Sequence, residues 1–122
     1  MRRPKFETIV ARALDGLPEE VLAAMENLEV TIEDEPSDEV REEFELAEDE
    51  TLFGAYRGTP LIDRGLADVP LLPDRIVLYQ VPLEESFPRT DELIEEIRRT
   101  VIHEVAHYLG MEEDEIDELG YG

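Results

Sequence analysis

The sequence predicts an α+β fold in which helices and a small, twisted mixed sheet of about three strands pack against one long helix. Residues 28–36 alternate between apolar and polar side chains, which is typical of a half-buried strand. Residues 75–82 are apolar on both faces, which indicates a central strand. Residues 90–109 form an amphipathic helix that carries both histidines of the chain.

Length and composition limit the possible classes of protein. A chain of 122 residues is expected to form one domain, 1–122, that buries roughly two-thirds of its unfolded surface. The absence of cysteine excludes disulfides and thiolate metal sites and fits a reducing compartment. Glu7 and Arg12 interrupt the apolar part of the N-terminus, and no apolar run reaches the roughly 20 residues of a membrane span. We therefore expect a cytoplasmic protein.

The charge of the chain narrows its expected partners. There are 33 acidic residues against 11 basic ones, a formal net charge of −22. Such a chain repels nucleic acids and anionic membranes, so neither is expected as a partner, and it attracts cations and basic peptides. The oligomeric state is left open.

The N-terminal third begins with two predicted helices. Apolar residues recur at helical spacing over residues 5–14, and Gly16 closes that segment. A second helix starts at residues 17–20, with proline and acids in its first turn, and continues to Met25. In the strand at 28–36, the inward residues are Leu28, Val30 and Ile32, and Pro36 ends it.

Residues 33–50 contain eleven acids and one base. Ser37 can cap a short helix there, although a mobile acidic surface segment fits the charge density as well. Residues 51–57 form a predicted strand that Gly54 weakens. If this strand is the sheet edge beside the histidine helix, a peptide can add to it along Gly54, Ala55 and Tyr56. Alternatively, Gly54 simply relieves packing at an ordinary edge strand.

The second half of the chain is expected to contain two loops and two helices. Residues 61–74 form a predicted surface loop, Pro82 ends the central strand, and residues 84–90 form another loop. Thr90 or Asp91 caps the long helix, which runs to Leu109. The last stretch, 112–122, makes a short helix with its apolar residues, Ile116 and Leu119, inward.

The two histidines predict a metal site. His103 and His107 are four residues apart, so their imidazoles lie one turn apart on the same face of a helix. The apolar stripe of Ile94, Ile97, Val101, Val105 and Leu109 lies on about the opposite side. Between the histidines, Glu104 is placed to take a proton from a metal-bound water rather than to bind the metal.

A third metal ligand must supply oxygen, because the chain has no further His and no Cys. Gly110 is expected to end the helix in a left-handed conformation that turns the chain back. Glu113 is then the best-placed carboxylate, with Asp114 and Asp117 as alternatives.

The series His103, Glu104, His107, Gly110, Glu113 resembles the metzincin pattern, although the third ligand position there is usually His. With the upstream FGAYRGTPL and RIVLYQVPLE, residues 4–120 resemble a small bacterial zincin-like family of minimal matrix-metalloprotease-like domains, which accept an acidic third ligand. The resemblance implies a zincin-like fold, one zinc ion, and peptide hydrolysis by a metal-activated water with Glu104 as general base. Only nine residues follow Glu113 and none is Met, so the methionine turn of metzincins is missing.

The predicted function is therefore a zinc metallopeptidase acting on peptides or proteins. Two alternatives stay open: a zinc-binding domain without turnover, and an acidic protein-interaction domain whose histidines are incidental. Six acids lie at positions 112–118. Their field strengthens cation binding but disfavours ionisation of the bound water, so we expect an alkaline activity optimum and a preference for basic substrates.

Overall fold

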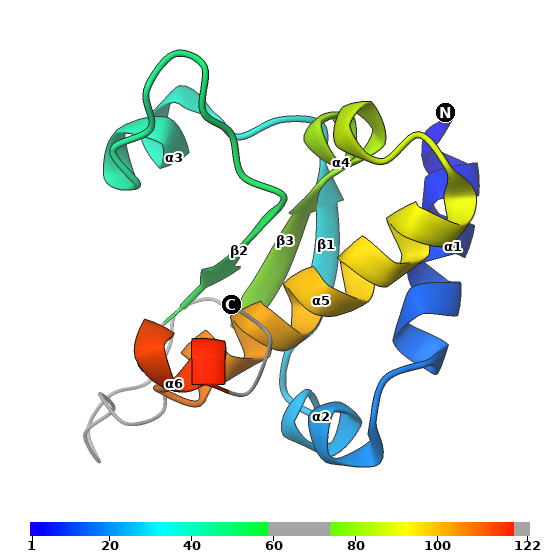
Figure 1. Ribbon diagram of the computed structural model, residues 1–122, viewed down its shortest axis with the longest axis vertical. Helices are drawn as coiled ribbons and strands as arrows, with labels where there is room; N and C mark the ends of the chain where they lie inside the picture. The colour runs from blue at the N-terminus through cyan, green and yellow to red at the C-terminus, as the bar shows by residue number, and fades with distance from the viewer. Residues whose placement is uncertain (59–73, 119–122) are drawn as a thin grey trace.

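The computed structural model describes residues 1–58 and 74–118, apart from the side chains of Glu113, Ile116 and Asp117. No helix in these ranges is long and apolar enough to cross a bilayer. Figure 1 shows the elements in order: α1 (Arg3–Asp15), α2 (Glu19–Ala24), β1 (Glu29–Glu33), α3 (Asp38–Glu43), β2 (Gly54–Arg57), β3 (Arg75–Tyr79), α4 (Gln80–Ser86), α5 (Thr90–Tyr108) and α6 (Glu113–Glu118).

The three strands form one mixed sheet in the order β1-β3-β2. The central strand β3 pairs in parallel with β1, with Val30 opposite Ile76, and in antiparallel fashion with β2, with Ala55 opposite Val77. The α+β class and the mixed three-stranded sheet are therefore confirmed. The strand β2, which precedes β3 in the chain, lies at one edge of this sheet.

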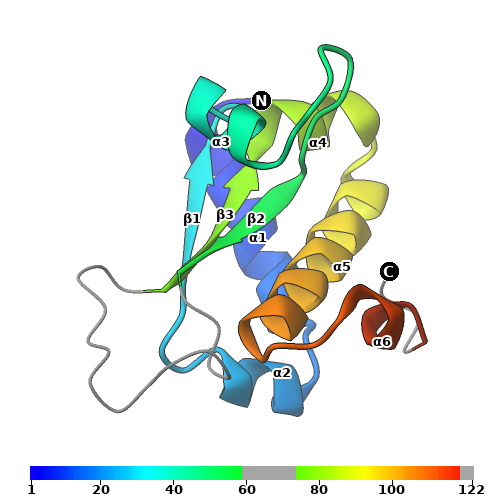
Figure 2. The same ribbon diagram turned by 90° about the vertical axis from the view of Figure 1, so that its left-hand side faces the viewer.

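The main core lies on the face of the sheet where α1 and α5 pack (Figures 1 and 2). Ile76 and Leu78 point from β3 into this core because alternate residues of a strand face the same side. Helices α1 and α5 supply most of its other buried side chains, which include Phe6, Ile9, Val10, Ala13, Leu93, Ile94, Ile97, Val101 and Val105. On the other face, Val77 and Tyr79 form a smaller cluster with Ala55.

The chain between β3 and α5 differs from the prediction. Pro82 does not end the strand, and residues 80–86 form helix α4 directly after β3, where a loop was expected from residue 84. Pro82 is buried in the first turn of α4. A proline is tolerated there because the first N–H groups of a helix have no partner within that helix. The side chain of Gln80, at the start of α4, accepts from Arg3 Nε at 2.6 Å and donates to the Met1 carbonyl at 2.9 Å.

Several predicted boundaries also change. Strand β2 begins at Gly54 rather than at residue 51. Helix α5 begins at Thr90, with Arg89 as its N-cap and no side-chain cap, so the predicted capping by Thr90 or Asp91 is wrong. The expected helix after Ser37 is confirmed: its hydroxyl accepts from the Val40 N–H at 3.3 Å. The predicted loop at 61–74, except for Asp74, and the predicted positions of Ile116 and Leu119 lie outside the described residues and side chains.

Arg98 joins α5 to the end of α1. Its Nε donates to the Ala13 carbonyl at 3.0 Å, and its Nη2 donates to the Arg12 carbonyl at 3.4 Å. These carbonyls belong to the last turn of α1, where a cation also interacts favourably with the helix dipole. The Arg98 Nη1 pairs with Glu95 at 2.6 Å. The guanidinium therefore fixes the middle of α5 against α1.

Candidate metal centre

The C-terminal half of α5 brings the two histidines together. The Nε2 atoms of His103 and His107 are 3.0 Å apart, and their rings are 4.8 Å apart between centroids at 53°. One ligand atom each from His103, Glu104 and His107 all lie within 4.8 Å of one another. All three residues are half-buried, so their ligand atoms converge in a partly desolvated place that solvent still reaches.

This set of atoms fits a zinc ion. Zinc is bound by imidazole nitrogen and carboxylate oxygen at about 2.0–2.2 Å, and tetrahedral geometry then separates two ligand atoms by about 3.3 Å. The observed 3.0 Å between the Nε2 atoms differs by only a few tenths of an ångström. Glu104 is close enough either to bind an ion or to contact it through one water. The sequence indicated that Glu104 is not well placed to bind the same metal ion as the two histidines. The short distance from its carboxylate to the histidine nitrogens makes it a candidate metal ligand as well.

The histidines occupy the flank of α5 that faces β2. Thr100, on the same helix, lies against Gly54, where an added Cβ would be only 2.7 Å from the Thr100 methyl carbon. At about 100° per residue, His107 projects within about 20° of Thr100, and His103 within about 60°. At the same spacing both histidines project about 120–160° away from the buried Val101 and Val105, as expected from the sequence, and the structure adds that this side of α5 borders β2. The stripe itself also shifts, because Leu109 is 42% exposed and Tyr108 is buried in its place.

Two aromatic rings tie the edge strand to the end of the histidine helix. The rings of Tyr56 in β2 and Tyr108 in α5 are 5.7 Å apart between centroids. The Tyr56 hydroxyl donates to Asp74 Oδ1 at 3.2 Å, and Asp74 is itself buried. Because Tyr108 follows His107 directly, these contacts fix the distance between β2 and the metal-binding turn.

Helix α5 ends at Tyr108 in a Schellman motif, with Leu109 as its C-cap. Gly110 has a φ of 83°, its N–H donates to the His107 carbonyl at 2.9 Å, and the Met111 N–H donates to the Ala106 carbonyl at 3.0 Å. A residue with a side chain would be strained at this φ. The chain turns there and begins α6 at Glu113, three residues later.

The third ligand is still a prediction. The side chains of Glu113 and Asp117 lie outside the part of the chain that the structure describes, and Asp114 is exposed. The peptide-binding role of Gly54, Ala55 and Tyr56 also stays a prediction. The first two are buried, and Gly54 has a clear packing role against Thr100.

The sequence and the fold of this chain are similar to those of known proteins. A sequence profile of zincin-like metallopeptidases matches residues 25–122. The chain belongs to this family. A solved structure described as a conserved hypothetical protein from Thermo thermophilus is similar with a TM-score of 0.57 and 23% identity, over 89% of this chain and 94% of that one, which supports the fold alone. A search of curated proteins gives no match.

Sequence reasoning missed two features of this zincin-like protein. The contact of Tyr56 with both Tyr108 and Asp74 joins residues that no local pattern connects. The position of Glu96, seven residues before His103 and therefore on a similar side of α5, could have been read from helical periodicity. Its partial burial could not, since that depends on how α4 and β2 pack around the helix.

Proposed function

We propose that this zincin-like chain is a zinc-dependent metallopeptidase. The convergence of His103, Glu104 and His107 beside the edge strand β2 is the observation that carries the proposal. Two imidazoles and a carboxylate are ligands that zinc prefers. The half-buried position of all three strengthens electrostatic interactions at the site while leaving it open to water and substrate.

Each residue has a role in peptide hydrolysis. His103 and His107 hold the zinc ion, with Glu113 proposed as the third ligand. When bound, zinc supplies Lewis-acid chemistry that polarises the scissile carbonyl and makes a water molecule more acidic. Glu104 accepts the proton of the attacking water and delivers it to the leaving amine nitrogen. Its carboxylate lies close enough to the histidine nitrogens for this transfer.

The substrate is proposed to lie along β2 as an added strand. One edge of β2 pairs with β3, and no other strand pairs with it among the described residues. Backbone groups of Gly54, Ala55 and Tyr56 would bind the substrate main chain. Since β2 lies against the flank of α5 that carries the histidines, a peptide bound there would pass the metal site. The negative charge of the chain supports a preference for basic peptides and an alkaline optimum.

Glu104→Gln tests the assigned base. This variant should keep zinc and fold but lose cleavage of a peptide library by at least about a hundredfold, because general-base catalysis typically contributes that much. Glu85→Gln, an exposed acid on α4, is the matched control and should cleave like the wild type. Cleavage that persists undiminished in Glu104→Gln would remove the assignment.

Elemental analysis tests the metal ligands. The purified wild type should contain about one zinc per chain, and the variant with both His103→Ala and His107→Ala should contain much less. Equal zinc in the two proteins would show that the metal is bound elsewhere. Zinc lost with the histidines but no cleavage by any variant would instead favour a zinc-binding domain without turnover.

A further inference from the structure

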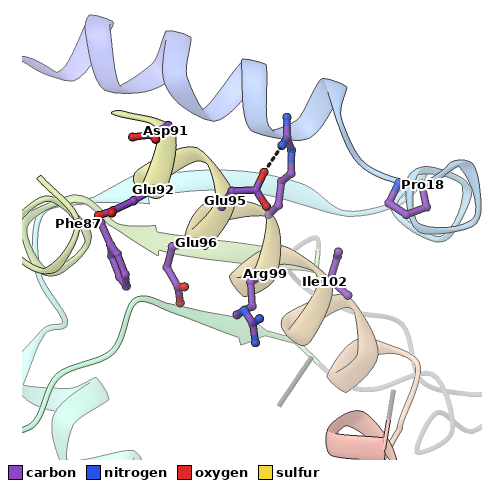
Figure 3. A pocket seen from close by; sticks show the side chains of 9 residues that line it. Pro18, Phe87, Asp91, Glu92, Glu95, Glu96, Arg99 and Ile102 are labelled. Atoms are coloured by element: carbon purple, nitrogen blue, oxygen red, sulfur yellow. Dashed lines mark hydrogen bonds and ion pairs between the residues drawn. The ribbon is translucent and has the colours of Figure 1, made fainter. Parts of the chain in front are cut away.

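A groove of about 570 Å³ runs along α5 upstream of the histidines. Its ends are marked by Pro18, just before α2, and Phe87, just after α4 (Figure 3). Between them, α5 lines the groove with charged side chains and with Ile102, the residue before His103. The groove therefore extends along α5 as far as the residue before the first histidine.

Glu96 is unusual among the acids of this groove. It is half-buried, and the described part of the chain gives it no hydrogen bond or ion pair. Burial raises the pKa of Glu96, although the nearby Arg99 opposes that shift. Glu95, one residue earlier, is exposed and paired with Arg98. Figure 3 shows Glu96 and Arg99 directed toward the side of α5 where β2 lies.

An apolar wall stands beside this carboxylate. Phe87, which lines the groove, packs edge-on against Phe53 with 5.4 Å between ring centroids. Both rings are half-buried, and Phe53 directly precedes β2. An aromatic wall next to an unpaired, partly desolvated carboxylate suits a long aliphatic side chain that ends in a cation.

We propose that Glu96, with Phe87 and Phe53, forms a subsite that binds a lysine or arginine side chain of the substrate. The inference rests on the proposed peptidase function and names a substrate class for it. Glu96 precedes His103 by seven residues, about 10 Å along the helix. An extended peptide advances about 3.3 Å per residue, so the basic side chain lies about three residues from the scissile bond.

Arg99 modulates this preference. Its guanidinium is exposed and lines the same groove without an ion pair to Glu96. Its positive charge lowers the affinity of the subsite for a cation. Removing it by Arg99→Gln should therefore strengthen the selection for lysine, whereas removing Glu96 should abolish it.

Binding and turnover are measured separately to test the subsite. The binding protein is zinc-loaded Glu104→Gln, and the probes are fluorescein-labelled ten-residue peptides of Ala and Ser around a central Gly-Leu bond. Each peptide carries Lys, Gln or Glu three residues from that bond, on one side or the other. Fluorescence anisotropy should show about threefold to fivefold tighter binding of one Lys peptide than of its Gln counterpart. The difference should shrink in 0.5 M NaCl.

Glu96→Gln should remove this preference, and Glu96→Lys should reverse it toward the Glu peptide. Glu95→Gln is the matched control, because it removes the same charge from the same helix at a residue that pairs with Arg98. Thermal melting and zinc content establish that each variant is folded.

Equal binding of Lys and Gln peptides, binding of none of the peptides, or the same loss in Glu95→Gln and Glu96→Gln would overturn the subsite. Cleavage that depends on Glu104 without any lysine preference would overturn it while leaving the peptidase intact. Lysine-selective binding without cleavage would instead support the subsite and contradict the peptidase function.

Discussion

Replacing Gly54 by alanine should push β2 away from the histidine helix. A Cβ at this position would lie 2.7 Å from the Thr100 methyl carbon and 3.0 Å from the Val77 carbonyl oxygen. Ordinary contact begins at 3.4 Å, so the strand or the helix must move by roughly 0.7 Å. Overpacking of this kind typically costs about 1–3 kcal/mol. We expect the free energy of unfolding to fall by about 2 kcal/mol.

Urea denaturation of Gly54→Ala, Thr100→Ser and the double variant measures the effect. Thr100→Ser removes the methyl group that collides, so the double variant should recover about 1 kcal/mol relative to the sum of the single changes. Zinc content should stay unchanged, since neither residue is a ligand, while peptidase activity should fall as β2 shifts. A Gly54→Ala protein as stable as the wild type, or strictly additive single effects, would refute the close packing of β2 on α5.

Three further predictions concern stability. Arg98→Ala should lower the free energy of unfolding by about 1–2 kcal/mol, because the carbonyl of Ala13 loses a charged donor. Urea denaturation measures this change, and a free energy of unfolding equal to that of the wild type would show that the contact does not stabilise the fold. Burial raises the pKa of Glu96 above its value in the unfolded chain, so its ionisation destabilises the fold as pH rises through that range. Glu96→Gln should therefore melt at a higher temperature than the wild type at pH 7. The difference should vanish at about pH 3, where the wild-type carboxyl is protonated in both states. An equal difference at both pH values would contradict this sign. Adding zinc at a hundred times its dissociation constant to chelator-treated protein should stabilise it by about 2.7 kcal/mol, and the melting temperature should not respond when His103 and His107 are both alanine.

Periodicity predicts the parts of the fold in which local pattern and packing agree. Ile97 and Val101 are fully buried on α5, as their helical spacing indicates. Val30 and Ile32 of β1 pack against the main core, as their alternation indicates. In each case the spacing of apolar residues within one continuous segment is sufficient to predict which face of the helix or strand is buried.

Prediction fails where packing between distant segments overrides local signals. Pro82 reads as a strand terminator, but the buried Leu83 and the hydrogen bonds of Gln80 to Arg3 and Met1 favour a helix at that point. The position of the histidines opposite the apolar stripe follows from the helical period, but the sequence does not tell which neighbouring element covers the flank beside them. Contact between Thr100 and β2 decides that question.

The candidate metal centre likewise has some features that the sequence predicts and others that depend on the fold. The spacing of His103 and His107 is sufficient to predict that their ring nitrogens meet, since four residues make about one helical turn. The end of α5 at Gly110 is also visible in the sequence, because glycine favours the left-handed conformation found there. The link from Tyr56 to Asp74 and Tyr108 requires the fold, because it joins three separate parts of the chain.

Helix α1 lies outside the segment that matches the family profile, which starts at residue 25. Yet Phe6 and Ala13 of this helix are completely buried against α5. The recognisable family segment is thus smaller than the unit that folds. Excising the first 24 residues would leave every histidine in place but would expose to water the apolar side of the helix that carries them, and exposed apolar patches of this kind favour aggregation.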